Sequence, residues 1–359
     1  MISPFKNNFF PRPRDQNRAF LLRTLAEVRG ESMITAMTVF NGVLYFATQN
    51  PLLAGGNVPR LYSWNPATMT VPVAVVLPAL AGVTNTRITG MAAYNNRLWI
   101  VTGASTTAGD NGQFWSMDTA GVWTGANILG FAGWTGGAVA NMVPVLFVFQ
   151  NQLVAAGVGG DAQLHLYFYN GAAWADEATG MGGAVRTQDQ IADFNNILYF
   201  GLGRDVIWRP VAGVYALAYR FPNVAAPVCG LATLNGQVWA SQLVAATWGY
   251  LTRVRPGNLA TDRLMRVAPS ILRMLPLPSG TPWLAGSGQV LLAQFVGGLA
   301  LLDPDGSLRT LVRHEGDQSI DAITGGQLVE YGRDYVVGLW GVLGGLGAAQ
   351  ATVRLAILE

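Results

Sequence analysis

The feature that most constrains this chain is a hairpin motif that recurs seven times. Each copy has a hydrophobic strand, a short turn rich in Asn and Gly, and a second hydrophobic strand; the clearest copy spans residues 39–46 with its turn at Asn41-Gly42. Asn-Gly and Asn-Asn tolerate the positive φ angles of a type I′ turn, whose twist matches the adjoining strands. The sequence therefore predicts seven β-hairpins, with the second turn residue at Gly42, Asn96, Asn151, Asn196, Gly236, Gly288 and Arg333.

The spacing of the hairpins is that of the blades of a β-propeller. The turns lie 40 to 55 residues apart, and a further hydrophobic strand, usually followed by a fourth, comes after each hairpin. Only 12% of residues are charged, and 44 glycines and 18 prolines favour many turns over long helices. Four antiparallel strands per repeat predict an all-β fold, a seven-bladed β-propeller.

The last repeat is one strand short, and the N-terminal region supplies the missing strand. Residues 22–25 (LRTL) repeat residues 308–311, and residues 30–34 (GESMI) resemble residues 316–320 (GDQSI). We therefore expect residues 20–28 to form the outer strand of blade seven and to pair with the C-terminal strand. The predicted domains are an extended arm over residues 1–19 and a propeller over residues 20–359.

In this repeat architecture, residues 20–359 resemble the seven-bladed β-propeller superfamily, which includes Kelch-like and WD40-like proteins. The repeated Gly-His and Trp-Asp pairs of WD40 blades and the double glycine of kelch repeats are not found. The resemblance therefore implies the fold, and it implies no partner of either family.

Few residues are suited to catalysis or metal binding. His165 lies between two leucines of a predicted strand, His314 follows another strand, and Cys229 is the only cysteine, which excludes an intramolecular disulfide. Zinc and nucleophile sites need several such groups together. We therefore expect no catalytic residue, no metal site and no cofactor, and no hydrolytic activity that depends on these three residues.

A carbohydrate-binding or glycosidase-type propeller acting outside the cell is the alternative. Residues 116–123 (SMDTAGVW) resemble the Asp-box turn of sialidases, with the glycine one position late and the threonine missing. Residues 303–306 (DPDG) fit a β-turn better than a calcium loop.

Most tryptophans are expected in the core, whereas Trp123, Trp174 and Trp283 are the candidates for a surface role, such as contact with a host-surface glycan.

Charge and hydropathy bear on partners and location. Four basic residues and one acidic residue give residues 1–19 a charge of +3, against +2 for the whole chain, and no basic stripe follows residue 30. We therefore expect no nucleic-acid partner.

Residues 119–160 and 335–353 are uncharged but are interrupted by glycine pairs, which predicts strands rather than membrane insertion. The N-terminal residues do not form a secretory signal, so the expected location is a virion or the cytoplasm.

The N-terminal arm differs in composition from the rest of the chain. It combines aromatic and basic residues with prolines and has no helical period. It is either a disordered tail or an arm that docks on a neighbouring subunit. The candidate partner-binding residues are Phe5, Phe9, Phe10, Arg12 and Arg14.

These observations lead to the hypothesis of a non-enzymatic structural or interaction protein whose partners are other subunits of a large assembly. The favoured assembly is a phage or virus particle, with the chain in its tail, baseplate or capsid surface. An intracellular WD40-like platform is a third alternative, for which the charge content is low.

Overall fold

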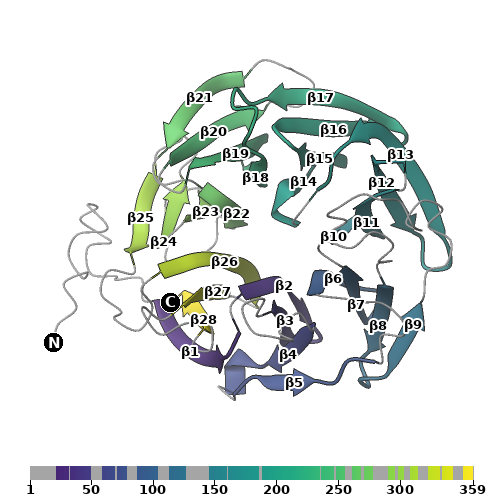
Figure 1. Ribbon diagram of the computed structural model, residues 1–359, viewed down its shortest axis with the longest axis vertical. Coiled ribbons are helices and arrows are strands. Elements are labelled where there is room, and N and C mark those ends of the chain that lie inside the picture. The colour runs from purple at the N-terminus through teal and green to yellow at the C-terminus, as the bar shows by residue number, and fades with distance from the viewer. Residues whose placement is uncertain are drawn as a thin grey trace.

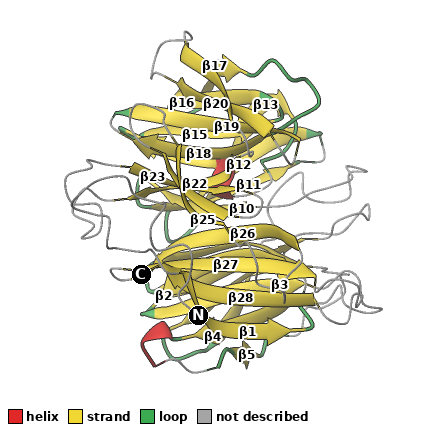
Figure 2. Cartoon of the chain, turned by 90° about the vertical axis from the view of Figure 1, so that its left-hand side faces the viewer, coloured by secondary structure: helices red, strands yellow, loops and turns green. Residues whose placement is uncertain are grey.

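The computed structural model is an all-β ring of sheets (Figure 1). It describes residues 22–31, 33–49, 59–68, 71–78, 87–103, 113–126, 145–159, 161–185, 188–234, 236–245, 248–254, 261–267, 271–277, 290–295, 298–302, 308–313, 322–331, 334–342 and 351–358. The side view in Figure 2 shows that strands make up most of the described chain, with two short 3-10 helices, η2 (Pro66–Thr68) and η3 (Gln188–Gln190). The arm over residues 1–19 lies outside the described residues.

Hydrogen bonding groups the strands into seven four-stranded antiparallel sheets, six of them from consecutive strands. The first three of these contain β2 (Met33–Phe40), β3 (Val43–Gln49), β4 (Arg60–Trp64) and β5 (Val73–Val75); β6 (Arg87–Tyr94), β7 (Arg97–Gly103), β8 (Gln113–Asp118) and β9 (Trp123–Ala126); and β10 (Val145–Phe149), β11 (Gln152–Val158), β12 (Gln163–Tyr169) and β13 (Trp174–Gly182).

The next three sheets repeat this order around the ring. They contain β14 (Ile191–Phe194), β15 (Ile197–Leu202), β16 (Asp205–Val211) and β17 (Val214–Arg220); β18 (Val228–Leu234), β19 (Gln237–Ala245), β20 (Trp248–Val254) and β21 (Thr261–Val267); and β22 (Ile271–Leu277), β23 (Val290–Phe295), β24 (Gly298–Leu302) and β25 (Leu308–Arg313).

The remaining sheet joins the two ends of the chain. Its order is β1 (Leu22–Arg29), β28 (Ala351–Leu358), β27 (Asp334–Val342) and β26 (Ala322–Tyr331). The pairing of β1 with β28 runs from Leu22 opposite Leu358 to Arg29 opposite Thr352, with an irregularity between Thr24 and Ala26. The expected pairing of the N-terminal strand with the C-terminal strand is confirmed, but the described strand covers residues 22–29 rather than 20–28.

Strand pairing is described for all seven sheets, but side-chain packing is described for fewer of them. In five consecutive sheets, from β2–β5 to β18–β21, burial is described along most strands, whereas β23 to β27 are described by their backbone alone. The expectation of a seven-bladed propeller therefore needs correction. The structure is an all-β propeller of four-stranded antiparallel blades in which five blades are shown with their packed interior, and the other two sheets mainly by strand pairing.

The hairpin turns have the backbone that their sequence predicts. Both turn residues have positive φ in the first hairpin, 49° at Asn41 and 71° at Gly42, and both do so again at residues 95–96, 150–151 and 195–196. Asn and Gly adopt this left-handed region at the lowest cost. The residue pairs noted in the sequence therefore form the turns that connect the inner two strands of each of these sheets.

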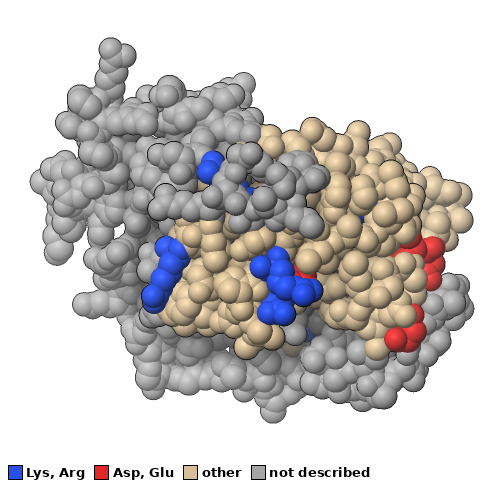
Figure 3. Space-filling model, turned by 90° about the horizontal axis from the view of Figure 1, so that it is seen from above, with Lys and Arg blue, Asp and Glu red and all other residues tan. Residues whose placement is uncertain are grey.

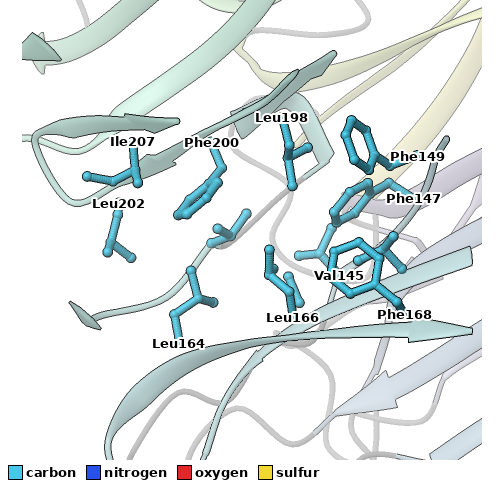
Figure 4. Packing of buried hydrophobic residues seen from close by; sticks show 13 residues of the cluster. Val145, Phe147, Phe149, Leu164, Leu166, Phe168, Leu198, Phe200, Leu202 and Ile207 are labelled. Carbon is cyan, nitrogen blue, oxygen red and sulfur yellow. The ribbon is translucent and has the colours of Figure 1, made fainter. Parts of the chain in front are cut away.

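The core lies between neighbouring sheets rather than within one. In the cluster drawn in Figure 4, Phe147 and Phe149 of β10 and Phe168 of β12 face Leu198 and Phe200 of the next sheet. Leu146, between Val145 and Phe147, packs in the opposite direction, against the preceding sheet. Both faces of a blade are thus buried, which explains the nearly continuous hydrophobic runs of the inner strands. Burial of each large side chain stabilises the fold by about 1.5 to 3 kcal/mol.

Amide side chains also connect the inner strands. From η3, the Gln188 side chain donates hydrogen bonds to the carbonyls of Met91 on β6 and Leu146 on β10. Gln190 donates to the carbonyl of Val228 on β18. One short helix therefore links the inner strands of three other sheets.

A charged cluster joins the outer parts of two blades. Glu177 on β13 accepts two hydrogen bonds of 2.7 Å from Arg209 on β16, one of 2.6 Å from the Gly213 N–H, and one from the Tyr215 hydroxyl. The Arg209 guanidinium also lies 4.6 Å from the centre of the Phe168 ring. Burial alone would raise the pKa of Glu177, but the bonds from Arg209, Tyr215 and Gly213 outweigh it and lower the pKa.

Removing the carboxylate of Glu177 should destabilise the protein strongly. The side chain of Arg209 is 8% exposed and that of Glu177 is 17% exposed. Glu177→Ala therefore leaves a buried guanidinium unpaired, and we expect a loss of about 3 to 5 kcal/mol in the free energy of unfolding. Urea unfolding followed by tryptophan fluorescence measures this. The control is Arg220→Ala, which breaks the exposed pair with Asp205; an equal loss in both variants contradicts the assignment.

Removing β1 should open the ring. Without residues 20–29, the edge of β28 loses its partner, and an unpaired strand edge promotes association with other chains. We expect this variant to aggregate, whereas a chain lacking only residues 1–19 stays soluble. Light scattering during refolding compares the two; a soluble, cooperatively melting protein without residues 20–29 would show that closure by β1 is dispensable.

Candidate functional site

The candidate site is a histidine held between two carboxylates. His165 lies on β12; its Nδ1 is 2.8 Å from Asp176 Oδ1, and its Nε2 is 3.1 and 3.2 Å from the two carboxylate oxygens of Asp161. Its side chain is 8% exposed, whereas both carboxylates are exposed to solvent. We call these three residues the histidine cluster.

The local backbone explains why the three side chains meet. Asp161 lies in the turn between β11 and β12, and its carboxylate accepts a hydrogen bond of 3.0 Å from the Gln163 N–H. Gly159 starts that turn; a Cβ at this position would lie 2.8 Å from two atoms of the His165 ring. The absence of a side chain at Gly159 thus makes room for the imidazole. Asp176 comes from β13, where it is paired with Tyr167, the residue two positions after His165.

The charges of the cluster favour a protonated imidazole. Both ring nitrogens face carboxylate oxygens, and only the doubly protonated ring can donate to both sides. Burial works against that charge, but hydrogen bonds and charges from Asp176 and Asp161 outweigh it, so the pKa of His165 is raised. The pKa of Asp161 is lowered, first by the Gln163 N–H and then by His165. The Tyr167 ring stacks on His165 with centroids 5.8 Å apart, and burial raises the pKa of its hydroxyl.

The arrangement is suited to holding strands together. Both imidazole nitrogens are bonded within the cluster, and among the described residues no group of three His, Cys, Asp or Glu side chains has a geometry that could hold a metal ion. A buried histidine bonded on both sides fixes the β11–β12 turn to β13. The sequence alone does not place a carboxylate beside His165; strand pairing brings Asp176 next to it.

The other residues singled out in the sequence are not brought to this cluster. Cys229 lies on β18, partly buried, with its Sγ 3.5 Å from the Pro227 carbonyl oxygen. His314, Trp283, residues 303–306 and the five arm residues lie outside the described residues.

The segment that resembles an Asp-box forms a turn. Asp118 ends β8, and its carboxylate accepts hydrogen bonds from the N–H groups of Ala120 (3.0 Å) and Val122 (2.9 Å). Arg97, on the neighbouring strand, donates to the hydroxyls of Ser116 and Thr124. The acidic side chain therefore stabilises the turn between β8 and β9, as turn chemistry predicts.

Two of the three tryptophans proposed for the surface are packed against the core. Trp174 is partly buried, and its ring lies 4.9 Å from that of Tyr169 and 5.4 Å from that of Phe114. Trp123 is likewise partly buried against the cluster between the first two sheets. These contacts correct the interpretation of both residues as surface groups.

Comparison with known proteins adds support for the fold alone. No known protein family and no curated protein sequence matches the chain. The Neurospora crassa Pan2 WD40 domain is similar with a TM-score of 0.58 at 8% identity, over 93% of this chain and 94% of that one. The polysaccharide lyase Uly1 is similar with a TM-score of 0.53 at 10% identity, over 90% and 89% of the two chains.

A third similar structure is much longer. Chaetomium thermophilum Raptor matches with a TM-score of 0.55 at 10% identity over 95% of this chain, which spans 29% of Raptor's length. Identities this low show a shared architecture and leave function open. By its fold, the chain is a β-propeller protein. None of the helical turns that the structure describes has the length and hydropathy needed to cross a bilayer.

The histidine cluster should make stability depend on pH. Because the pKa of His165 is raised above its unfolded value, its stabilising contribution is complete below about pH 6.5 and is lost as pH rises through the folded pKa. We expect the melting-temperature difference between the parent and His165→Gln to be largest near pH 6 and smaller near pH 9. Thermal melts in buffers of one ionic strength measure this.

The control for this experiment keeps the histidine and removes one carboxylate. Asp176→Asn should bring the pKa of His165 closer to its ordinary value and move the change to lower pH, which an NMR titration of the imidazole resonances follows. A difference between the parent and His165→Gln that is the same at every pH contradicts the assignment.

Proposed function

We propose that this chain is a non-enzymatic interaction subunit of a large protein assembly, with a phage or virus particle as the favoured assembly. The supporting observation is the placement of exposed hydrophobic side chains. Most of those in the described residues lie on outer strands or in segments next to them, at the rim of the ring where a neighbour could pack: Val71, Val73, Val76, Val122, Val211, Val214 and Leu264. Val71, Val73 and Val76 fall within one short segment, and Val211 is paired with Val214 across β16 and β17. Exposed apolar groups that lie close together in this way are typical of contact surfaces.

The described charged groups support the same proposal, since several serve the fold. Glu177 with Arg209, His165 with its two carboxylates, and Glu31 with Arg60 all bridge strands or blades. The face seen in Figure 3 is mostly uncharged where it is described. A surface of this kind favours packing against protein over binding to a polyanion.

The N-terminal arm should contribute to assembly and not to folding. Burial of Phe9 and Phe10 on a neighbour would stabilise the contact by about 1.5 to 3 kcal/mol each before ordering costs, with Arg12 and Arg14 meeting acidic groups or carbonyls beside it. We expect a chain lacking residues 1–19 to melt like the parent but to join its assembly more weakly. Co-sedimentation with the large-particle fraction from the native source measures this.

A matched pair of variants separates aromatic contact from loss of length. Phe9→Ala with Phe10→Ala should weaken co-sedimentation, whereas Asn7→Ala with Asn8→Ala should leave it close to the parent. If the parent itself sediments as a free subunit, the assembly role is wrong. If the truncated chain co-sediments like the parent, only the role of the arm is wrong.

A further inference from the structure

One outer strand of the ring presents an uncharged, exposed edge. Strand β5 pairs with β4 through Val73, Ala74 and Val75 and has no partner on its other side among the described strands. It lies within the segment Val71–Pro78 (VPVAVVLP), where Val71, Val73 and Val76 are 76%, 62% and 86% exposed. We call residues 71–78 the apolar edge. Open strand edges with apolar side chains readily accept another strand.

Most other outer strands carry charges that protect their edges. Arg29 on β1, Asp176 on β13, Arg220 on β17 and Arg266 on β21 are all exposed, and β25 contains Arg309 and Arg313. Strand β9 is also uncharged, but its exposed residues are Thr124 and Gly125. Among the outer strands whose side chains are described, β5 thus combines an open edge, no charge and exposed valines.

The apolar edge is suited to a copy of itself. A twofold axis brings the same strand of both copies into one contact: if residue i of one copy faces residue j of the other, then j also faces i. A charged residue on the strand would therefore be present twice in this small contact. The sequence Val73-Ala74-Val75 reads the same in both directions. With the axis at Ala74, Val73 of each copy faces Val75 of the other, and Val71 faces Leu77. Every opposed pair is therefore apolar, and no like charges meet.

We propose that two copies of this chain associate through their apolar edges, with β5 pairing antiparallel to β5 about a twofold axis at Ala74. Pro72 and Pro78 bound the pairing because proline lacks an N–H to donate. Because the contact is short and buries little surface, we expect the dimer to be weak and its formation to depend on concentration. It is independent of the arm, so its failure leaves the proposed docking of residues 1–19 untouched.

Sedimentation equilibrium of the purified full chain, from about 1 μM to about 1 mM, tests the proposal. We expect the parent to show a monomer–dimer equilibrium. Val73→Lys should raise the dimer dissociation constant by about tenfold or more, because the pairing would place an ammonium against Val75 of the other copy. Amide hydrogen exchange at residues 73–75 should slow as the concentration of the parent rises. A parent that stays monomeric over this range overturns the proposal.

Two further variants test the register and the location. Val75→Glu alone should also weaken the dimer, whereas Val73→Lys combined with Val75→Glu should restore it, since each lysine then faces a glutamate of the other copy. Val224→Lys changes an equally apolar residue, 74% exposed on the connection from β17 to β18, and should dimerise like the parent. Melting temperatures establish that each variant is folded. Equal effects of Val73→Lys and Val224→Lys, or no rescue in the double variant, overturn the pairing.

Discussion

The pairing of β1 with β28 is the constraint on which the ring depends. Every other sheet is made from consecutive strands, so its hydrogen bonds close short loops, whereas this sheet joins residues 22–29 to residues 351–358. Its loop-closure entropy is therefore the largest in the molecule, although that cost grows only slowly with length. Apolar packing offsets this entropy cost. Once the sheet is complete, Ala26 and Leu355 pack with Ile34 and Phe46 of the next sheet. The two ends of the chain thereby become part of the packed interior.

Several charged residues of the described chain connect elements that the hydrophobic core already brings close. Glu177 reaches from one blade to Arg209 and Tyr215 of the next, and Glu31 reaches from the β1–β2 connection to Arg60 and Tyr62 on β4. Such pairs add little net stability compared with apolar packing, but they are costly to break because a buried charge is left alone. They therefore favour one relative placement of neighbouring blades.

The sequence predicts much of the fold because its signals are local. Turn residues such as Asn41-Gly42 and Asn195-Asn196 specify their own backbone, and the hydrophobic runs identify the inner strands. The shared LRTL stretch predicts the closing strand to within two residues. The histidine cluster was beyond this reasoning, since Asp176 reaches His165 only through the pairing of β12 with β13, eleven residues away in the chain. The packing of Trp174 against Tyr169 and Phe114 does not follow from the sequence, because a tryptophan next to a loop can still lie against the core.

A closed ring leaves a propeller with one kind of strand edge, the outer strand of each blade, and this restricts how such a protein can meet others through its backbone. On most described outer strands a charged side chain stands at the edge, so an approaching strand would have to desolvate it. The charges at Arg29, Asp176, Arg220 and Arg266 thus disfavour strand addition at these outer strands. The short β5, bounded by Pro72 and Pro78, is open at its edge but long enough for only a few hydrogen bonds. A contact made there is short and therefore reversible, so the proposed docking on a larger structure relies on another part of the chain.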